Sequence, residues 1–366
     1  MYHIAVIKGD GTGPEVINEA IKVLKACEKN HNISFRFYDL PYNAKRYIQE
    51  GITLTNTELK NLEKFDAILL GAIGCPSVTP GILEREILLK IRFGLDQYIN
   101  LRPVKKYKNV QTPLKDNKLI DYVVIRENTG GMYTDMGSSL KKGTPDEEAN
   151  QIMHYTYKQV ERCVRYAYEY TKKRHQNSIW LGLSDEEKSQ GFIGKLTYCG
   201  KSNVLNYVSD LWLRVINEIG VEYPEIKQDY VHVDACCIHM IERPEIFDTI
   251  ITTNMFGDII TDLAAVTQGG LGVASGGNIN PGSVSMFEPI GGTAPDFTGK
   301  NQINPIAAIG AAELMLEHFN EHKIAKIIDA AKNHVINMMQ SQQAGKMGYS
   351  TSEVGDIIST YIEEFK

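Results

Sequence analysis

The chain has 366 residues, of which 43% are hydrophobic, so it holds enough apolar material for one large or two smaller folded cores. A formal net charge of −6 at pH 7 disfavours a nucleic-acid partner, which normally requires a basic face, and favours small-molecule ligands. The six cysteines show no Cys-x-x-Cys spacing, so we expect free thiols and a cytoplasmic location. Residues 2–7 already read as a strand and no apolar run approaches about 18 residues, so neither an export signal nor a membrane span is expected.

The first hundred residues alternate between strand and helix patterns. Ile4–Ile7 predict a strand, residues 9–14 a glycine-rich turn, and the apolar spacing after Pro14 a helix that Thr12 or Gly13 can cap. A second strand over Ala67–Leu70 runs into another glycine turn. This alternation indicates an α/β fold with parallel strands.

After Arg102-Pro103 the pattern changes to longer loops and strands such as Tyr122–Ile125, with polar stretches at 137–150 and 176–190. A second domain is expected to begin near residue 98. From Val354 to Phe365 the apolar residues return at helical spacing, which predicts a C-terminal helix packed on the first domain. We therefore expect a first domain over residues 1–98 and 269–366 and a second over 99–268.

Asp258 and Asp262 lie four residues apart in Asn254-Met-Phe-Gly-Asp-Ile-Ile-Thr-Asp262, which reads as a helix after a buried strand over Phe247–Thr253. Residues at this spacing share one helix face, and carboxylate oxygens are the ligands that Mg²⁺ prefers. The same spacing also occurs on solvated helix faces. Asp234, after a strand ending at Val233, is a third candidate oxygen ligand.

Arg92, Arg102 and Arg126 are candidate carboxylate clamps, because a guanidinium group binds a carboxylate through two parallel hydrogen bonds. Taken singly, each arginine is better explained by a structural ion pair, and only the combination of the three favours an anionic substrate with more than one carboxylate. Lys201 precedes a helical pattern that starts at Val204 and is either a base of lowered pKa or an exposed lysine. Tyr133 is either one of 19 tyrosines or a proton donor.

The segment 269–277 holds five glycines but does not match a dinucleotide-binding fingerprint, because it follows a predicted helix instead of a strand. Residues 9–13 have the strand-to-helix setting without the required spacing. A bound nucleotide therefore has to be argued from other residues, and the fold is not expected to be a Rossmann fold.

Taken together, the motifs resemble those of the β-decarboxylating dehydrogenases, the isocitrate/isopropylmalate dehydrogenase family. The resemblance runs nearly end to end, through Gly9-Asp-Gly-Thr-Gly-Pro-Glu15, Leu101-Arg-Pro-Val104, Arg126-Glu-Asn-Thr-Gly-Gly131, Lys201-x-Asn-Val204, Val233-Asp234, residues 254–262 and Ala294-Pro-Asp296 with Asn304-Pro305. It implies a two-domain α/β fold of the isopropylmalate dehydrogenase type, with a large mixed sheet flanked by helices, a dimer interface and an arm in the second domain. Two departures stand out: Gly291 replaces a common histidine, and residues 344–348 depart from the usual Asp-x-Gly-Gly pattern.

The resemblance also implies roles for individual residues. Arg92, Arg102 and Arg126 would hold the carboxylates of a malate-type substrate, and Asp234, Asp258 and Asp262 would hold Mg²⁺ or Mn²⁺. Lys201 would take the proton of the substrate hydroxyl, and Tyr133 would protonate the enolate left by CO₂. In the family, Lys201 and Asp234 come from the neighbouring subunit of a homodimer. The implied cofactor is NAD rather than NADP, because Asp296 would repel a 2′-phosphate, and the implied cofactor-binding residues are Gly292, Thr293, Ala294, Asp296 and Asn304.

The identity of the substrate depends on the side chains that contact the γ-substituent of its malate skeleton. Leu88, Leu89 and Val204 correspond to the family's pocket positions, and an all-apolar set cannot satisfy a buried third carboxylate. We therefore expect 3-isopropylmalate, oxidised to 2-oxoisocaproate with release of CO₂ and NADH. The alternatives are tartrate or D-malate, which the sequence over residues 96–102 also resembles, then isocitrate or homoisocitrate, and a noncatalytic regulatory homologue.

Overall fold

The computed structural model describes residues 1–114 and 118–365, which form two compact units. The first unit comprises residues 1–97, 105–115 and 265–366, and the second comprises 98–104 and 116–264. The domain boundaries expected from the sequence, 1–98 with 269–366 and 99–268, stay a prediction.

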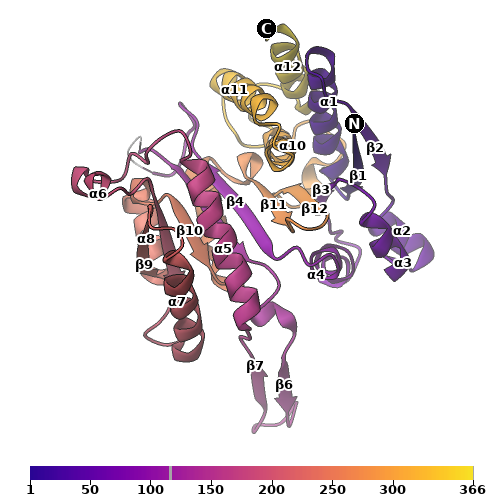
Figure 1. Ribbon diagram of the computed structural model, residues 1–366. Coiled ribbons are helices and arrows are strands. Elements are labelled where there is room, and N and C mark those ends of the chain that lie inside the picture. Colours follow the sequence, from indigo (N-terminus) through magenta and orange to yellow (C-terminus); the bar gives the residue numbers. More distant parts are fainter. Residues whose placement is uncertain (115–117, 366) are drawn as a thin grey trace. The chain divides into compact units, whose positions relative to one another are not determined.

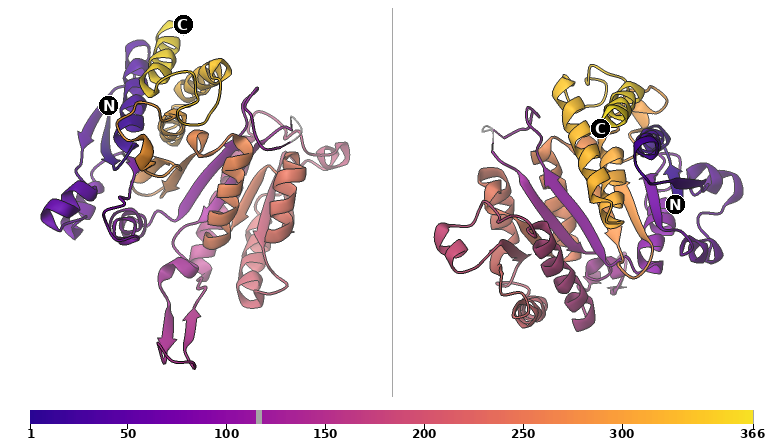
Figure 2. Two further views of the ribbon diagram at one scale, coloured as in Figure 1. Left: turned by 180° about the vertical axis from the view of Figure 1, so that it is seen from behind. Right: turned by 45° about the horizontal axis from the view of Figure 1, so that its top comes forward.

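The first unit contains five strands in the order β2-β1-β3-β12-β11, parallel except for the β11–β12 pair. Its elements are β1 (Tyr2–Gly9), α1 (Gly13–Asn30), β2 (Phe35–Asp39), α2 (Ala44–Glu50), α3 (Asn56–Leu62), β3 (Ala67–Ala72), a π-helical segment (Glu84–Leu89), α4 (Lys90–Gly94), β11 (Ser275–Ile279), β12 (Ser285–Pro289), α10 (Ile306–His318), α11 (His322–Met338) and α12 (Thr351–Glu364). Helices α1, α10, α11 and α12 pack against one another, and α10 also packs on β12 and β11 (Figures 1 and 2). The C-terminal helix is thus confirmed on the first unit, although Phe365 lies just beyond it.

The second unit contains β4-β5-β10-β8-β9 and a separate two-stranded hairpin. Its elements are β4 (Ile99–Lys105), β5 (Asp121–Glu127), β6 (Gly137–Leu140), β7 (Glu148–Gln151), α5 (Tyr157–Arg174), α6 (Asp185–Ser189), β8 (Gly194–Gly200), α7 (Asn206–Gly220), β9 (Ile226–His232), α8 (Val233–Glu242), β10 (Thr249–Thr252) and α9 (Asn254–Gln268). Helix α5 packs on α7 and on β5, β8 and β10. The β6–β7 hairpin projects from the body of this unit in both figures (Figures 1 and 2).

Several sequence predictions hold in detail. β1, β3, β5, α1 and α9 lie where expected, and segment 269–277 leads into β11 instead of opening a helix. The expected α/β class with a large mixed sheet flanked by helices is confirmed. Among the described residues this sheet has ten strands, five in each unit. Pro14 lies in the first turn of α1, but the Thr12 hydroxyl does not cap that helix.

The two polar stretches contain regular structure that the sequence analysis did not assign. Residues 137–150 form β6 and most of β7, and residues 176–190 contain α6. All residues of β6 and β7 are exposed, and the two strands lack the apolar alternation by which strands are recognised. Val204 and the residue after it lie before α7, and Val204 is 63% exposed, so it belongs to a turn and not to the buried helix face.

Candidate active site

A cluster of three predicted residues lies in the second unit, where β5 and β10 deliver the chain to α9. The Arg126 Nη1 donates to Asp258 Oδ1 at 2.5 Å, and the Tyr133 hydroxyl donates to Asp258 Oδ2 at 2.7 Å. The Arg126 guanidinium also lies 5.2 Å from the centre of the Tyr133 ring. Because β5 and β10 are neighbouring parallel strands, their carboxyl ends bring Arg126 and the start of α9 to one edge of the sheet.

The electrostatics of this cluster follow from its burial. Partial burial alone raises the pKa of Asp258, but the charge of Arg126 and the hydrogen bonds from Tyr133 and Arg126 outweigh it, so the pKa is lowered. Burial, and then the hydrogen bond to Asp258, raise the pKa of Tyr133. At neutral pH the cluster therefore holds an ionised carboxylate and a protonated phenol, which is a proton donor oriented by its acceptor.

Close packing at Gly257 fixes the approach of α9 to Arg126. A Cβ at this position would lie 2.4 Å from Cγ and 2.6 Å from Cβ of Arg126. The glycine of the Asn254–Asp262 motif is therefore explained by contact with the arginine.

Arg102 and Asp262 belong to the same unit as this cluster. Arg102 is buried and donates from Nε to Asn100 Oδ1 at 2.7 Å, and its charge contributes to the lowered pKa of Asp258. Asp262 is exposed one helical turn beyond Asp258 on α9. The charge of Arg102 thus reaches Asp258, and the roles given to Arg102 and Asp262 stay predictions.

Lys201 and Asp234 form a separate pair in the second unit. Lys201 Nζ donates to Asp234 Oδ1 at 2.8 Å, and this hydrogen bond lowers the pKa of Asp234. Asp234 lies in the first turn of α8, and its side chain is 66% exposed. Among residues 1–114 and 118–365, no three His, Cys, Asp or Glu side chains are arranged to hold a metal ion, so Asp234 is not brought to Asp258 and Asp262 within one chain.

Arg92, the third predicted clamp, lies in α4 of the first unit. It is buried, and its Nη2 donates to Glu288 Oε1 at 2.9 Å, which also accepts a hydrogen bond from Asn278. Its Nε is buried with no hydrogen-bond partner among the described residues. The predicted pocket residues Leu88 and Leu89 precede it, both half-buried, at the end of the π-helical segment.

The predicted cofactor segment lies against the first turn of the chain. The backbone N–H and the hydroxyl of Thr12 both donate to the Thr293 carbonyl, at 2.9 Å and 3.1 Å, and a Cβ on Gly11 would lie 2.2 Å from the same oxygen. Glycine is therefore required at position 11, at φ +56°, because the backbone of Thr293 lies against it. The 9–13 turn thus holds residue 293 in place. Ala294 adopts a left-handed conformation at φ +41°.

A pocket of about 430 Å³ opens beside this turn, lined among others by Asp10, Gly11, Lys45, Cys75 and Thr293. Asp10 accepts hydrogen bonds from the backbone of Ala44 and Gly74, and burial raises its pKa despite them.

The remaining cofactor residues lie on one stretch of the first unit. Gly292 and Asp296 are exposed, whereas Asn304 is buried, with Oδ1 accepting from the Ile306 backbone and Nδ2 donating to the Gln342 carbonyl at 3.1 Å. Asn304 thus anchors the segment to residues near 342. Gly291 is half-buried.

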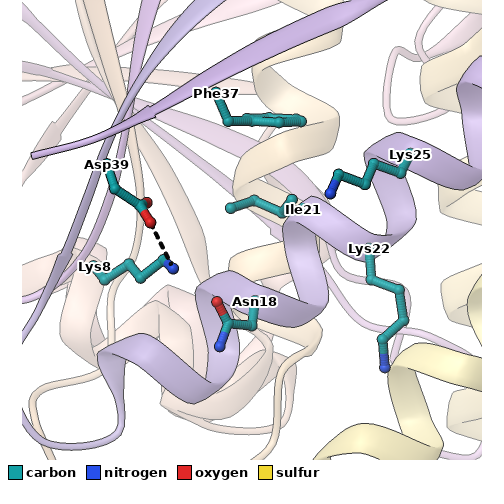
Figure 3. A pocket seen from close by; sticks show the side chains of 7 residues that line it. All are labelled: Lys8, Asn18, Ile21, Lys22, Lys25, Phe37 and Asp39. Carbon is teal, nitrogen blue, oxygen red and sulfur yellow. Dashed lines mark ion pairs between the residues drawn. The ribbon is translucent and has the colours of Figure 1, made fainter.

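A second hollow, of about 550 Å³, lies between α1 and β2 and contains none of the predicted residues (Figure 3). Lys8 pairs there with Asp39 at 3.0 Å, and Lys22 pairs with Glu19 and Asp356. Because two of its three lysines are engaged in ion pairs, the hollow has no arrangement that points to a ligand.

Sequence reasoning gave no role to three residues beside the cluster, the buried Glu127 and Asn254 and the partly buried Tyr155. Glu127 lies in the motif Arg126–Gly131 and Asn254 in the motif 254–262, so both could have been found from these motifs. Tyr155 has no sequence signal of its own. All six cysteines are free thiols, and among the described residues no helix is both long and apolar enough to cross a membrane.

The comparisons with known proteins agree with the geometry. The family model described as isocitrate/isopropylmalate dehydrogenase matches residues 3–358. The chain belongs to the isocitrate/isopropylmalate dehydrogenase family. It is 42% identical over 362 residues to a 3-isopropylmalate dehydrogenase of Corynebacterium efficiens, covering 98% of this chain and 99% of that protein, and 44% identical over 359 residues to that of Corynebacterium glutamicum, covering 97% and 98%.

A solved structure supports the same assignment. The crystal structure of isocitrate dehydrogenase from Methylococcus capsulatus aligns over all of both chains with a TM-score of 0.84 and 30% identity. The family and these relatives are dehydrogenases, so the chain is an oxidoreductase, and its fold is of the isocitrate dehydrogenase type and not a Rossmann fold.

Proposed function

We propose that this family member catalyses the NAD-linked, metal-dependent oxidative decarboxylation of 3-isopropylmalate to 4-methyl-2-oxopentanoate, CO₂ and NADH, a step of leucine biosynthesis. The observation that carries the proposal is the end-to-end similarity to relatives named 3-isopropylmalate dehydrogenase. The Arg126–Tyr133–Asp258 cluster supports it, because it combines a carboxylate clamp, a proton donor and a hard oxygen ligand.

The side chains present fit a divalent cation. Asp258 and Asp262 offer only oxygen ligands on one helix face, which suits Mg²⁺ or Mn²⁺. The fit requires Asp234 of the partner subunit, since the described residues of one chain do not gather the three carboxylates. A bound cation would supply Lewis-acid polarisation of the substrate hydroxyl and carbonyl oxygens.

The protein's own residues then have distinct tasks. Arg92, Arg102 and Arg126 bind the two carboxylates of the malate skeleton and fix its orientation. Lys201 would take the proton of the substrate hydroxyl at C2, and NAD, when bound, would supply the hydride acceptor for that oxidation. Tyr133 keeps its proton at neutral pH, because its pKa is raised, and donates it to the carbon that CO₂ has left.

In the first unit, Gly292, Thr293 and Ala294 would hold NAD, with Asn304 anchoring the segment, and the exposed carboxylate of Asp296 would select against a 2′-phosphate. The half-buried Leu88 and Leu89, with Val204 of the partner subunit, would meet the isopropyl group.

A homodimer completes the proposal. Large apolar side chains stand exposed on α8, at Ile238 and Ile241, and on α9, at Ile259 and Val266, beside Asp234 and Asp258 on the same helices. Exposed apolar surface of this kind marks interaction sites. Lys201 and Asp234 would serve the partner's site, and the free thiols suit a cytoplasmic setting.

The test measures NADH formation with NAD and Mg²⁺ or Mn²⁺ on 3-isopropylmalate, D-malate, tartrate, isocitrate and homoisocitrate in parallel. We expect the highest kcat/KM with 3-isopropylmalate. Preference for D-malate or tartrate would keep the mechanism and refute the substrate. Absence of turnover with all five acids would refute the proposed function.

A further inference from the structure

Arg126 is held from two sides. Besides its bond to Asp258, its Nε and Nη2 both donate to Asn254 Oδ1, at 2.9 Å and 2.7 Å. Arg126 and Asn254 are each 1% exposed. Two charge-assisted hydrogen bonds to one buried oxygen fix the plane of the guanidinium group.

Asn254 is itself fixed at three atoms. Its Oδ1 faces Arg126, its Nδ2 donates to the Gly130 carbonyl at 3.0 Å, and its backbone N–H donates to the Tyr155 hydroxyl at 2.8 Å. An aspartate cannot make the bond to Gly130, and an amide flip would break the bonds to Arg126. The geometry therefore requires an amide at this position.

The loop after Arg126 is locked by the same group of residues. Glu127, fully buried, accepts hydrogen bonds from the Thr129 backbone and hydroxyl and from the Gly130 backbone, at 2.7–2.8 Å. A Cβ at Gly130 would lie 2.7 Å from the Tyr155 ring, and one at Gly131, at φ +73°, would lie 2.5 Å from the Tyr155 hydroxyl. This loop leads directly to Tyr133, so Asn254 joins the arginine to the segment that carries the proton donor.

We propose that Asn254 is a positioning residue, which holds the Arg126 guanidinium and the 127–131 loop in place for the reaction. The inference rests on the proposed function, because a cation held by Asp258 would weaken the hydrogen bonds of that carboxylate to Arg126 and Tyr133. The two bonds from Arg126 to Asn254 do not involve Asp258, so they would keep the guanidinium plane fixed when a cation is bound. The bond from Asn254 to Gly130 would likewise hold the 127–131 loop, which precedes Tyr133, in place.

The test compares Asn254→Ala and Asn254→Asp with Thr252→Val as the matched control. Thr252 is buried two residues earlier, and its hydroxyl donates to the Cys199 carbonyl at 2.8 Å, so its replacement removes a buried hydrogen bond outside the site. We expect Asn254→Ala to raise the KM for 3-isopropylmalate by about tenfold or more, the equivalent of one well-formed hydrogen bond. Asn254→Asp, which keeps an acceptor for Arg126 but loses the donor to Gly130, should lower kcat more than it raises KM.

Two further readouts do not depend on turnover. Calorimetric titration with 3-isopropylmalate and Mg²⁺, without NAD, should show binding weakened by Asn254→Ala and unchanged by Thr252→Val. Side-chain ¹⁵N NMR should show that the Arg126 Nε–H is protected from exchange in the wild type and in Thr252→Val but not in Asn254→Ala. Wild-type KM, binding and Nε–H protection in folded Asn254→Ala would overturn the inference. If the wild type turns over none of the malate-type acids, the proposed function fails while the NMR comparison still decides the role of Asn254.

Discussion

Replacing Tyr133 by phenylalanine tests the assignment of the proton donor. The substitution removes the hydroxyl that donates to Asp258 at 2.7 Å and leaves the ring beside Arg126 in place. The lost bond stabilises the resting protein by about 1.5 kcal/mol, the lower end for a hydrogen bond to a charged group, because the Asp258 side chain is 48% exposed. A positioned general acid contributes about 10²–10⁴-fold to the rate, so kcat should fall by at least about 100-fold with a small change in KM.

The assay follows NADH formation over pH 6–10, with the stability of each variant measured by urea unfolding. Tyr157→Phe is the matched control, because that phenol also donates to a carboxylate, Glu218, at 2.9 Å but lies outside the cluster. Since the pKa of Tyr133 lies above its usual value of about 10, the phenol stays protonated and should cause no loss of activity below that pH. A Tyr133→Phe variant with kcat within threefold of the wild type would refute the role given to this residue.

Three other substitutions test neighbouring contacts. Glu288→Gln leaves buried Arg92 without its carboxylate partner and should lower the free energy of unfolding by about 3 kcal/mol in a urea titration. Gly257→Ala forces a Cβ against Arg126, so the KM for substrate should rise at least about tenfold while the chain still folds, as circular dichroism would show. With metal chelated, the stability advantage of the wild type over Asp258→Asn should be full above the usual carboxyl pKa of about 4 and be lost as pH falls through the lowered pKa of Asp258; an advantage that does not decline on acidification would contradict this ion pair.

The sequence alone predicted the elements whose buried residues follow a clear local apolar pattern. Val354 and Ile358 recur at helical spacing on α12 and are fully buried, and Ile4 and Ile7 lie within a buried strand. The β6–β7 hairpin could not be predicted, because its eight residues are exposed and carry no apolar alternation. Val204 was misplaced for a related reason, since one apolar residue at the right spacing does not show where a helix begins.

The sequence predicted the residues of the site but not the hydrogen bonds between them. Motif resemblance named Arg126, Tyr133 and Asp258, but their hydrogen bonds depend on β5 and β10 being neighbours, which is a long-range property of the sheet. Asn254 illustrates the limit, because an asparagine at the start of a helix reads as a cap, whereas here its amide bonds the arginine and a distant carbonyl.

The pairing of Asp258 has a consequence for ligand binding. Both of its oxygens are engaged in the chain described here, one by Arg126 and one by Tyr133, so a cation must compete with the arginine for this carboxylate. A substrate carboxylate bound by Arg126 would relieve that competition, and by linkage a bound cation would free Arg126 for the substrate. We therefore expect Mg²⁺ to bind at least about fivefold more tightly in the presence of 3-isopropylmalate, and the acid more tightly by the same factor in the presence of Mg²⁺. Equilibrium dialysis of each ligand at fixed concentrations of the other measures both factors, and equal affinities with and without the second ligand would show that the Arg126–Asp258 bond does not couple the two.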